Sequence, residues 1–321
     1  MPAIADPPGF DSTDPLARVL HFVRVSGTFY CHSELGSPWG LFLPPMPGCM
    51  WFHCVNEGRA LLEVDGAVHE LERGSFALVP HGRGHRIRSA RRVAAPNVVE
   101  LPHELQTDRY AVLRHGGDGP RATLLCGVVK LDATVGAELE RSLPPVLHVE
   151  PRAAAHGGSM EMTLALMAAE SKAPRPGGET IVTRLADVLV VQAIREWIEV
   201  DPAARSGWLG ALRDPKLGPA LAALWGDPSR DWTVAGLARV AAMSRSAFAA
   251  RFEELVGEPP MRYLARMRMR VASAELAAGH ATVAAIAERA GYRSEAAFSR
   301  AFKRLTGLPP GAVRRAGKST S

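Results

Sequence analysis

The chain contains the stretch Val283-Ala-Ala-Ile-Ala-Glu-Arg-Ala-Gly-Tyr-Arg-Ser-Glu-Ala-Ala-Phe-Ser-Arg-Ala-Phe302, which predicts a short helix, a turn and a second helix. An earlier stretch repeats it: Val234-Ala-Gly-Leu-Ala-Arg-Val-Ala241 matches the first helix, and Phe248-Ala-Ala-Arg-Phe252 matches the second. The offset is 49 residues (283 − 234) in the first helix and 50 (298 − 248) in the second, so the later copy has one extra turn residue. Two repeated helix pairs are typical of proteins that place helices in the DNA major groove.

Helix start and stop signals frame both copies. The predicted helices cover residues 215–225, 234–241, 245–255, 260–278, 283–290 and 295–305. A hydroxyl side chain precedes four of them and can cap a helix N-terminus, at Thr233, Ser244, Thr282 and Ser294. Glycine follows three of them, where a left-handed residue ends a helix, at Gly257, Gly279 and Gly307. In the second helix of each copy one stripe is expected in the core: Phe248, Phe252 and Leu255, then Phe298, Phe302 and Leu305.

Positive charge is concentrated in the duplicated segment. Residues 226–321 hold 16 Lys/Arg and 8 Asp/Glu, a net charge of +8 (16 − 8). The preceding residues hold 22 and 25, a net charge of −3 (22 − 25). A basic module beside a near-neutral partner favours a polyanion as the ligand, and double-stranded DNA is the first candidate.

The outward faces of the second helices carry the side chains that can reach base edges. Arg300 is the leading candidate for a guanine contact, because a guanidinium fork matches O6 and N7 of guanine. Glu295 can accept from a cytosine amino group or serve as a negative charge at its helix N-terminus. The predicted DNA-binding residues are Ser244, Arg245, Ser246, Ala249, Ser294, Glu295, Ala296, Ser299, Arg300 and Lys303. The later copy is therefore expected to be the dominant reader and the earlier copy a positioner.

The helix predicted over residues 260–278 joins the two copies. Arg262, Arg266 and Arg270 are spaced four residues apart, so neighbouring pairs share a face of this helix. They are the predicted phosphate contacts that orient the reading helices; a solvated helix face is the alternative.

From about residue 214 to residue 315 the chain resembles the AraC/XylS-type DNA-binding domain, in which one long helix bridges two helix-turn-helix units. The resemblance lies in Gly291-Tyr-Arg-Ser-Glu-Ala-Ala-Phe-Ser-Arg-Ala-Phe302 and Gly307-Leu-Pro-Pro-Gly-Ala-Val-Arg314. It implies a sequence-specific transcription regulator, most often an activator that contacts RNA polymerase, and not an enzyme. Ala250 stands where some family members have a long polar side chain, which implies weaker or differently placed base readout by the first unit.

The N-terminal half is predicted to form short strands separated by turns. Asp65-Gly66 lies between the runs 60–64 and 68–71, a hairpin signature, and strands at this spacing favour a small antiparallel barrel. The run Gly74-Ser-Phe-Ala-Leu-Val-Pro-His-Gly-Arg-Gly-His85 resembles the second motif of the cupin barrel. His53-Cys-Val-Asn-Glu-Gly58 resembles its first motif, with Trp51 in place of a histidine. The resemblance implies a cupin sensor domain ahead of the DNA-binding domain.

Two kinds of sensor chemistry are candidates in this barrel. His53, Glu57 and His85 could hold a divalent metal, since three such ligands with open positions suit zinc, iron or nickel; buried hydrogen-bonded histidines are the alternative. Cys31 and Cys126 could sense oxidants, which requires an accessible thiol with a lowered pKa; inert buried thiols are the alternative. The four cysteines show no CxxC spacing and are expected to be free thiols in a reducing compartment.

Helices predicted over 159–170 and 179–200 follow the barrel. The second is apolar around more than half of its circumference, so it could pack on the barrel and on a second subunit; an ordinary buried helix is the alternative.

Together these features predict an α+β protein with two domains: a cupin-like antiparallel barrel followed by helices, then an all-α domain. The expected segments are a flexible N-terminus (1–15), a sensor domain with dimerisation helices (16–200), a linker (201–213), the double helix-turn-helix domain (214–316) and a tail (317–321). No run is long enough to span a bilayer and no secretory leader is evident, so we expect a cytoplasmic homodimer that binds DNA and an effector. The alternative function is a metal-dependent cupin enzyme with an accessory helical domain.

Overall fold

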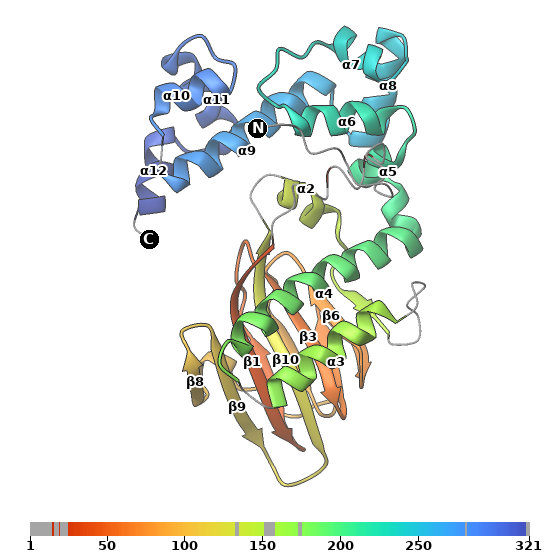
Figure 1. The fold of residues 1–321 in the computed structure, drawn as a ribbon, viewed down its shortest axis with the longest axis vertical. Coiled ribbons are helices and arrows are strands. Elements are labelled where there is room, and N and C mark those ends of the chain that lie inside the picture. The colour runs from red at the N-terminus through yellow and green to blue at the C-terminus, as the bar shows by residue number, and fades with distance from the viewer. Residues whose placement is uncertain are drawn as a thin grey trace. The chain divides into compact units, whose positions relative to one another are not determined.

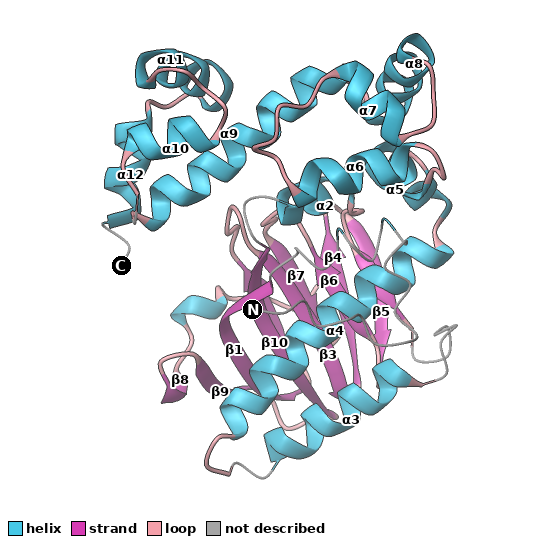
Figure 2. Cartoon of the chain, turned by 45° about the horizontal axis from the view of Figure 1, so that its top comes forward, coloured by secondary structure: helices cyan, strands magenta, loops and turns pink. Residues whose placement is uncertain are grey.

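The computed structural model describes residues 15, 19, 25–131, 135–150, 158–172, 175–279 and 281–318. The chain folds into two compact units, shown in Figures 1 and 2. The sheet unit comprises residues 25–131 and 143–201, and the helical unit comprises residues 1–24, 132–142 and 202–321. The expected combination of a sheet-rich domain and a helical domain is confirmed.

Two sheets build the sheet unit. The seven-stranded sheet has the order β11 (Leu147–Val149), β6 (Phe76–Val79), β3 (Met50–Glu57), β10 (Arg121–Leu131), β1 (Val25–Gly36), β9 (Tyr110–Gly116) and β8 (His103–Thr107). The four-stranded sheet has the order β2 (Gly40–Leu43), β7 (His85–Arg88), β4 (Arg59–Val64) and β5 (Ala67–Glu72), and the short helix η1 covers Val98–Glu100. β1 and β9 are parallel; the other paired strands are antiparallel.

Alternating side chains fill the space between the two sheets. Leu62 and Ile87 of the smaller sheet and Val79 and Leu124 of the larger one belong to the same buried cluster. The predicted hairpin is confirmed: β4 and β5 pair in register, and the turn residues Asp65 and Gly66 have φ values of 49° and 83°. Two successive residues with positive φ match the right-handed twist of the strands that they join.

Two helices cover the outer face of the seven-stranded sheet (Figure 1). They are α3 (Ser159–Lys172) and α4 (Gly178–Val200), close to the predicted bounds. α4 buries Val182, Leu189 and Trp197, among others, and leaves Ile181, Val188 and Val191 exposed. α4 therefore presents apolar side chains both to the interior of the sheet unit and to solvent.

The helical unit contains α2 (Val135–Ser142), η2 (Pro202–Arg205), α5 (Gly207–Arg213), α6 (Leu217–Gly226), α7 (Val234–Val240), α8 (Arg245–Val256), α9 (Pro260–Ala278), α10 (Val283–Arg289), α11 (Glu295–Thr306) and α12 (Pro310–Lys318). α7 to α11 lie within one residue of their predicted bounds at each end. The segment expected as a linker, residues 201–213, includes α5, which buries Trp208, Leu209 and Leu212. Apolar burial of this kind makes α5 part of the helical core rather than a tether.

Chain connectivity places α2 between β10 and β11, yet α2 packs in the helical unit. From the sequence we expected residues 16–200 to form one sensor domain, so the membership of residues 132–142 in the helical unit is a new finding. Among the residues that the structure describes, no helix combines the length and the apolar character needed to cross a membrane.

Candidate nucleic-acid interface

Each helix pair of the repeat starts on a side-chain cap. Thr233 and Thr282 accept hydrogen bonds from the backbone N–H groups of Gly236 and Ala285 at 3.0 and 3.2 Å. Ser244 and Ser294 accept from Ala247 and Ala297 at 3.3 and 3.2 Å. All four predicted caps are confirmed, and the hydroxyls of Ser244 and Ser294 therefore hold the N-termini of α8 and α11.

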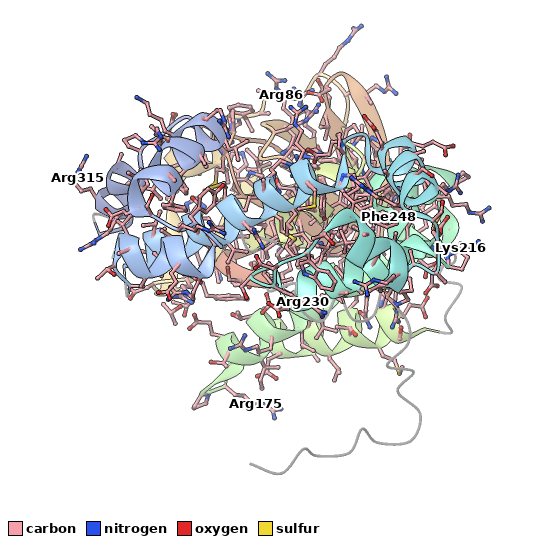
Figure 3. The ribbon with its side chains drawn as sticks, turned by 90° about the horizontal axis from the view of Figure 1, so that it is seen from above. Arg86, Arg175, Lys216, Arg230, Phe248 and Arg315 are labelled. Atoms are coloured by element: carbon pink, nitrogen blue, oxygen red, sulfur yellow. The ribbon has the colours of Figure 1, made fainter. Side chains whose placement is uncertain are left out.

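An aromatic core fixes the rotation of both recognition helices. Phe248 and Phe252 of α8 are fully buried, and Phe252 meets Tyr263 of α9 with ring centroids 5.6 Å apart. In Figure 3 the Phe248 side chain lies among the helices of this unit, whereas that of Arg315 projects from its edge. Phe298 and Phe302 of α11 are equally buried. With these rings directed inward, the opposite faces of α8 and α11 are turned to solvent.

The third residue expected in the core of each helix, Leu255 in α8 and Leu305 in α11, is less buried than the two phenylalanines. Leu305 is 40% exposed, so its assignment to the core was wrong. Ala301 is buried instead, because the stripe of α11 that meets the rest of the unit passes through this smaller residue. Leu255, the corresponding position of α8, is half-buried.

The outward faces of α8 and α11 carry the predicted DNA-binding residues. The exposed side chains are Arg245 and Ser246 on α8 and Glu295, Ala296, Arg300 and Lys303 on α11, while Ala249 and Ser299 are half-buried. None of the ion pairs formed among the described residues uses Arg245, Arg300 or Lys303. These cations are therefore available to an external anion.

Two exposed arginines beside this face were not singled out from the sequence. Arg293 ends the four-residue turn 290–293 of the second unit, and Arg304 follows Lys303 on α11. The turn of the first unit, 241–243, is one residue shorter, as the unequal offsets of the repeat predicted. The difference between the two offsets indicated one extra residue in the second turn, which is the turn that contains Arg293.

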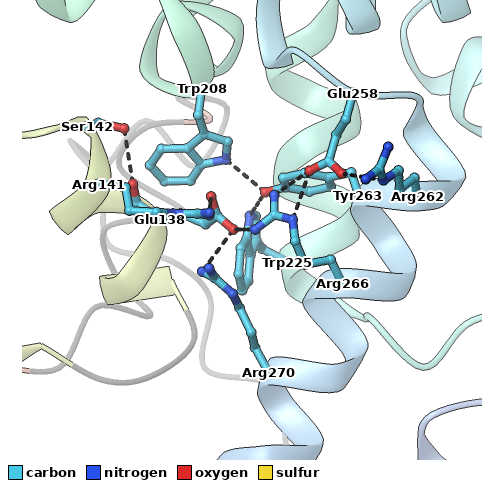
Figure 4. Close-up of polar contacts among 10 residues, drawn as sticks. All are labelled: Glu138, Arg141, Ser142, Trp208, Trp225, Glu258, Arg262, Tyr263, Arg266 and Arg270. Carbon is cyan, nitrogen blue, oxygen red and sulfur yellow. Dashed lines mark hydrogen bonds and ion pairs between the residues drawn. The ribbon is translucent and has the colours of Figure 1, made fainter. Parts of the chain in front are cut away.

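The three predicted phosphate contacts on α9 meet carboxylates (Figure 4). Glu138 of α2, whose side chain is only 5% exposed, pairs with Arg266 and accepts from Arg270 at 3.0 Å. Glu258 accepts from Arg266 Nε at 2.8 Å and lies 3.8 Å from Arg262. In this arrangement Arg262 is the most exposed of the three, at 76% of its side chain.

The sheet unit brings His53 and His85 together inside the barrel. Their Nε2 atoms are 2.8 Å apart, and the Nδ1 atom of His53 lies 3.0 Å from the sulfur of Cys126. Burial lowers the pKa of His53 well below its usual value and that of His85 to about 4. Both imidazoles are therefore neutral near pH 7, and one can donate its Nε2 proton to the other.

Glu57 does not join these histidines. It lies exposed at the end of β3, opposite Thr123, whereas His53 lies opposite Cys126. Three strand residues lie between His53 and Glu57, so their Cα atoms are about 13 Å apart along an extended chain. The three-ligand set predicted from sequence is therefore wrong as one site. No cluster of three His, Cys, Asp or Glu side chains suited to a metal occurs among the described residues.

Cys31 and Cys126 occupy paired positions on β1 and β10, and both are buried. Burial raises the pKa of each thiol. A raised pKa disfavours the thiolate, which is the reactive form, so this geometry supports the inert alternative.

A cavity of about 1230 Å³ lies on the outer side of the seven-stranded sheet. Its strand side includes Glu34, Arg114 and Arg121, and Arg175 and Glu179 line it from the segment at the start of α4. Arg114 donates from Nε to Glu34 at 3.0 Å, and its Nη1 pairs with Glu104. The cavity thus offers both signs of charge to a small polar molecule.

The fold and the exposed basic helices define a class of protein: a DNA-binding transcription regulator with an N-terminal β-sheet domain. Residues 14–199 match the family model described as Cupin, and residues 237–316 match the one described as Helix-turn-helix domain. The chain is 35% identical over 305 residues to an AraC-like transcription regulator of Streptomyces lividans, covering 94% of this chain and 98% of that protein. The chain belongs to the AraC-like transcription regulators with an N-terminal cupin domain.

Two further similarities concern proteins with more specific descriptions. The RCS-specific HTH-type transcriptional activator RclR of Escherichia coli is 27% identical, with coverage of 94% of this chain and 97% of that protein. The DNA-binding domain of AdpA, solved in complex with a target DNA, is 33% identical and covers 33% of this chain and 96% of that chain, with a TM-score of 0.31. The curated relatives are transcription regulators, which supports the regulator over the cupin-enzyme alternative.

Proposed function

We propose that this regulator reads a two-part DNA site with α8 and α11 and that α11 is the dominant reader. The observation that carries the proposal is the outward face of α11, where Arg300 and Lys303 are exposed and take part in none of the ion pairs among the described residues. A guanidinium on a helix in the major groove can distinguish guanine from other bases. The exposed surface of α8 offers one cation outside these ion pairs, Arg245, because Arg251 pairs with Asp214 and Glu254. Short side chains accompany Arg245, which favours positioning over readout.

The test is a binding titration of the full-length protein with its own promoter-region duplex and with a random duplex of equal length. We expect tighter binding to the promoter DNA and a fall in affinity with salt, since phosphate contacts release counterions. Equal affinity for the two duplexes at every salt concentration would overturn the proposal.

The proposed partner of the α3–α4 surface is a second copy of this chain. Met162 and Leu166 of α3 and Ile181, Val188 and Val191 of α4 are between 43% and 62% exposed. On α4, residues 181, 188 and 191 recur at helical spacing, so a second α4 can pack along the same stripe in a twofold arrangement. Val188→Glu is expected to shift the sedimentation coefficient to that of a monomer. Leu105→Glu, at another exposed apolar residue, is the matched control and should not.

The proposed effector is a small polar molecule bound in the cavity beside the seven-stranded sheet. The support is its size and the opposed charges of its lining, together with a barrel interior filled by buried side chains. A bound effector raises the unfolding temperature. A compound that does so for the wild type but not for Arg121→Ala would support the site, and an unchanged response in the variant would exclude it.

We also propose that the protein acts in the cytoplasm and contacts RNA polymerase as an activator, in keeping with the activator description of RclR. In vitro transcription with purified RNA polymerase tests the direction of control. A rise in transcript with added protein is expected, and a fall would make the chain a repressor.

A further inference from the structure

Arg268 lies in the middle of α9 and holds a loop of the first helix-turn-helix unit. Its Nε donates to the carbonyl oxygen of Pro228 at 2.8 Å, and its Nη2 donates to those of Ser229 and Arg230 at 3.3 and 2.8 Å. The loop joins α6 to α7, so the guanidinium ties the bridging helix to the entrance of the first unit. These are three hydrogen bonds from one side chain to backbone acceptors.

The loop is itself well ordered by local bonds. The carboxylate of Asp227 accepts from the Ser229 hydroxyl at 2.7 Å and from the Arg230 backbone N–H at 3.1 Å. The indole of Trp232 donates to the Asp227 carbonyl at 2.8 Å, and the Arg230 guanidinium stacks 4.5 Å from the Trp232 ring centroid. Arg268 therefore binds a loop that is held by its own hydrogen bonds. Because this loop leads directly into α7, its position fixes the position of α7.

The same guanidinium touches the turn of the second unit. Gly291 stands between α10 and α11, and a Cβ atom built there would lie 2.9 Å from Nη1 and 3.3 Å from Cζ of Arg268. The backbone of this turn thus packs directly on the guanidinium that the first unit's loop engages. One side chain contacts both helix-turn-helix units.

A small cavity lies beside Arg268, between the two helix-turn-helix units. A cavity of about 180 Å³ is lined by Pro228 and Ser229 of the first unit and by Ile286, Arg289 and Ala290 of the second. Arg268 forms none of the ion pairs found among the described residues. Its guanidinium is held by hydrogen bonds to backbone carbonyl groups and not by a carboxylate. A planar fork of donors is suited to fixing orientation, which a single ammonium group is not.

We infer that Arg268 is a positioning residue that sets the distance and angle between the two recognition helices, and with them the spacing of the two DNA elements that the protein accepts. The inference rests on the proposed function, in which α8 and α11 read one site together. One added base pair displaces the second element by about 3.4 Å and rotates it by about 34°. A rigid pair of readers rejects such a change, and a loosened pair tolerates it.

The first experiment measures the geometry without DNA. Exposed Arg239 of α7 and Glu288 of α10 are equivalent positions of the repeat, and the four native cysteines are buried, so Arg239→Cys and Glu288→Cys can carry a pair of spin labels. We expect the distance distribution between the labels to widen on Arg268→Ala and on Arg268→Lys. An unchanged distribution in both variants would overturn the inference whatever the DNA data show.

The second experiment measures spacing preference. The full-length protein is titrated with the footprinted two-part site and with versions that have one base pair removed or one or two added between the elements. We expect the wild type to lose about tenfold or more in affinity for each altered spacing, and Arg268→Ala to lose about threefold or less. Arg251→Ala, which removes an exposed arginine of α8 paired with Asp214 and Glu254, is the control and should keep the wild-type profile.

The outcomes separate the inference from the proposed function. A wild type that shows no dependence on spacing would remove the proposal that both units read one site. A spacing-dependent wild type with an unchanged profile in Arg268→Ala would overturn the role of Arg268 alone. Thermal unfolding of each variant shows that it is folded, and Arg268→Lys serves as the milder substitution if Arg268→Ala is not.

Discussion

The carboxylate of Glu138 accepts a hydrogen bond from Arg270 at 3.0 Å, joining residues 132 positions apart in the chain. Arg266 pairs with the same carboxylate, and Arg141 does so from within α2. One buried anion therefore compensates several arginines, which fixes α2 against α9. The helix that bridges the two helix-turn-helix units is held by α2, which in the order of the chain comes between β10 and β11.

Glu138→Ala should lower the free energy of unfolding by about 3 kcal/mol, because it leaves partly buried arginines without their anion. Glu138→Gln keeps the shape and should cost less. Urea denaturation measures both, with Glu140→Gln on the same helix as the control. A loss below about 1 kcal/mol for Glu138→Ala would show that water replaces the carboxylate readily.

The same substitution bears on DNA binding. If Glu138 withholds Arg266 and Arg270 from phosphates, Glu138→Gln should steepen the dependence of log affinity on log salt by about 0.9 for each additional phosphate that is neutralised. Adding Arg266→Ala to Glu138→Gln should reverse part of that increase. A slope that stays at the wild-type value would assign these arginines a purely structural role.

Ala242 and Gly291 occupy the same place in the two turns, and both have positive φ, 50° and 79°. A left-handed conformation costs an alanine roughly 1–2 kcal/mol, part of which the greater freedom of glycine in the unfolded chain offsets. Ala242→Gly is therefore expected to raise the free energy of unfolding by about 0.5 kcal/mol. Gly291→Ala should lower it by more than 1 kcal/mol, since the new methyl group also crowds Arg268. Thermal or urea unfolding of the two variants checks the opposite signs.

Arg300→Ala should relax the base preference at one position of the site, with a loss of about 1–3 kcal/mol for the preferred base. Ser246→Ala should have a smaller effect, because Ser246 lies on the helix with fewer outward cations. Competition with a library of single-base variants of the site measures both. Equal losses of preference in the two variants would contradict the unequal roles of α8 and α11.

Acid should destabilise the sheet unit through His53 and His85. Their pKa values are lowered in the folded protein, His85 to about 4, so the unfolded chain takes up protons first as the pH falls below about 6.5. Stability is fully present above that pH and falls towards pH 4 by up to about 1.4 kcal/mol per pH unit for each histidine. Urea unfolding between pH 7.5 and 5 should show this slope, and His85→Gln should reduce it. If His85→Gln keeps the wild-type dependence of stability on pH, groups other than His85 are responsible for the loss of stability in acid.

Local signals in the sequence were sufficient for the helical repeat. The caps at Ser244 and Ser294, the glycine that ends α8 and the unequal turns depend on neighbours within a few residues, so the repeat could be read directly. The buried stripe of α11 was harder to predict from the sequence. The exposure of Leu305 depends on which helices lie beyond the C-terminal end of α11. Sequence periodicity alone does not contain that information.

Long-range pairing could not be predicted in this way. The pairing of Glu138 with Arg266 depends on how α2 docks, and nothing near residue 138 marks it as part of the helical unit. Similarly, the cupin-like spacing placed His53, Glu57 and His85 in one site, but strand register separates Glu57 from the two histidines. A motif fixes residue order, while the pairing of strands fixes which side chains meet.

The insertion of α2 has a consequence for how this chain is made and divided. Residues 132–142 leave the ribosome before β11 and well before α9, so Glu138 is synthesised long before its arginine partners exist. The helical unit is complete only when the last third of the chain has been translated. A fragment cut at the boundary near residue 202 would carry Arg266 and Arg270 without Glu138, and its DNA-binding behaviour would differ from that of the whole regulator.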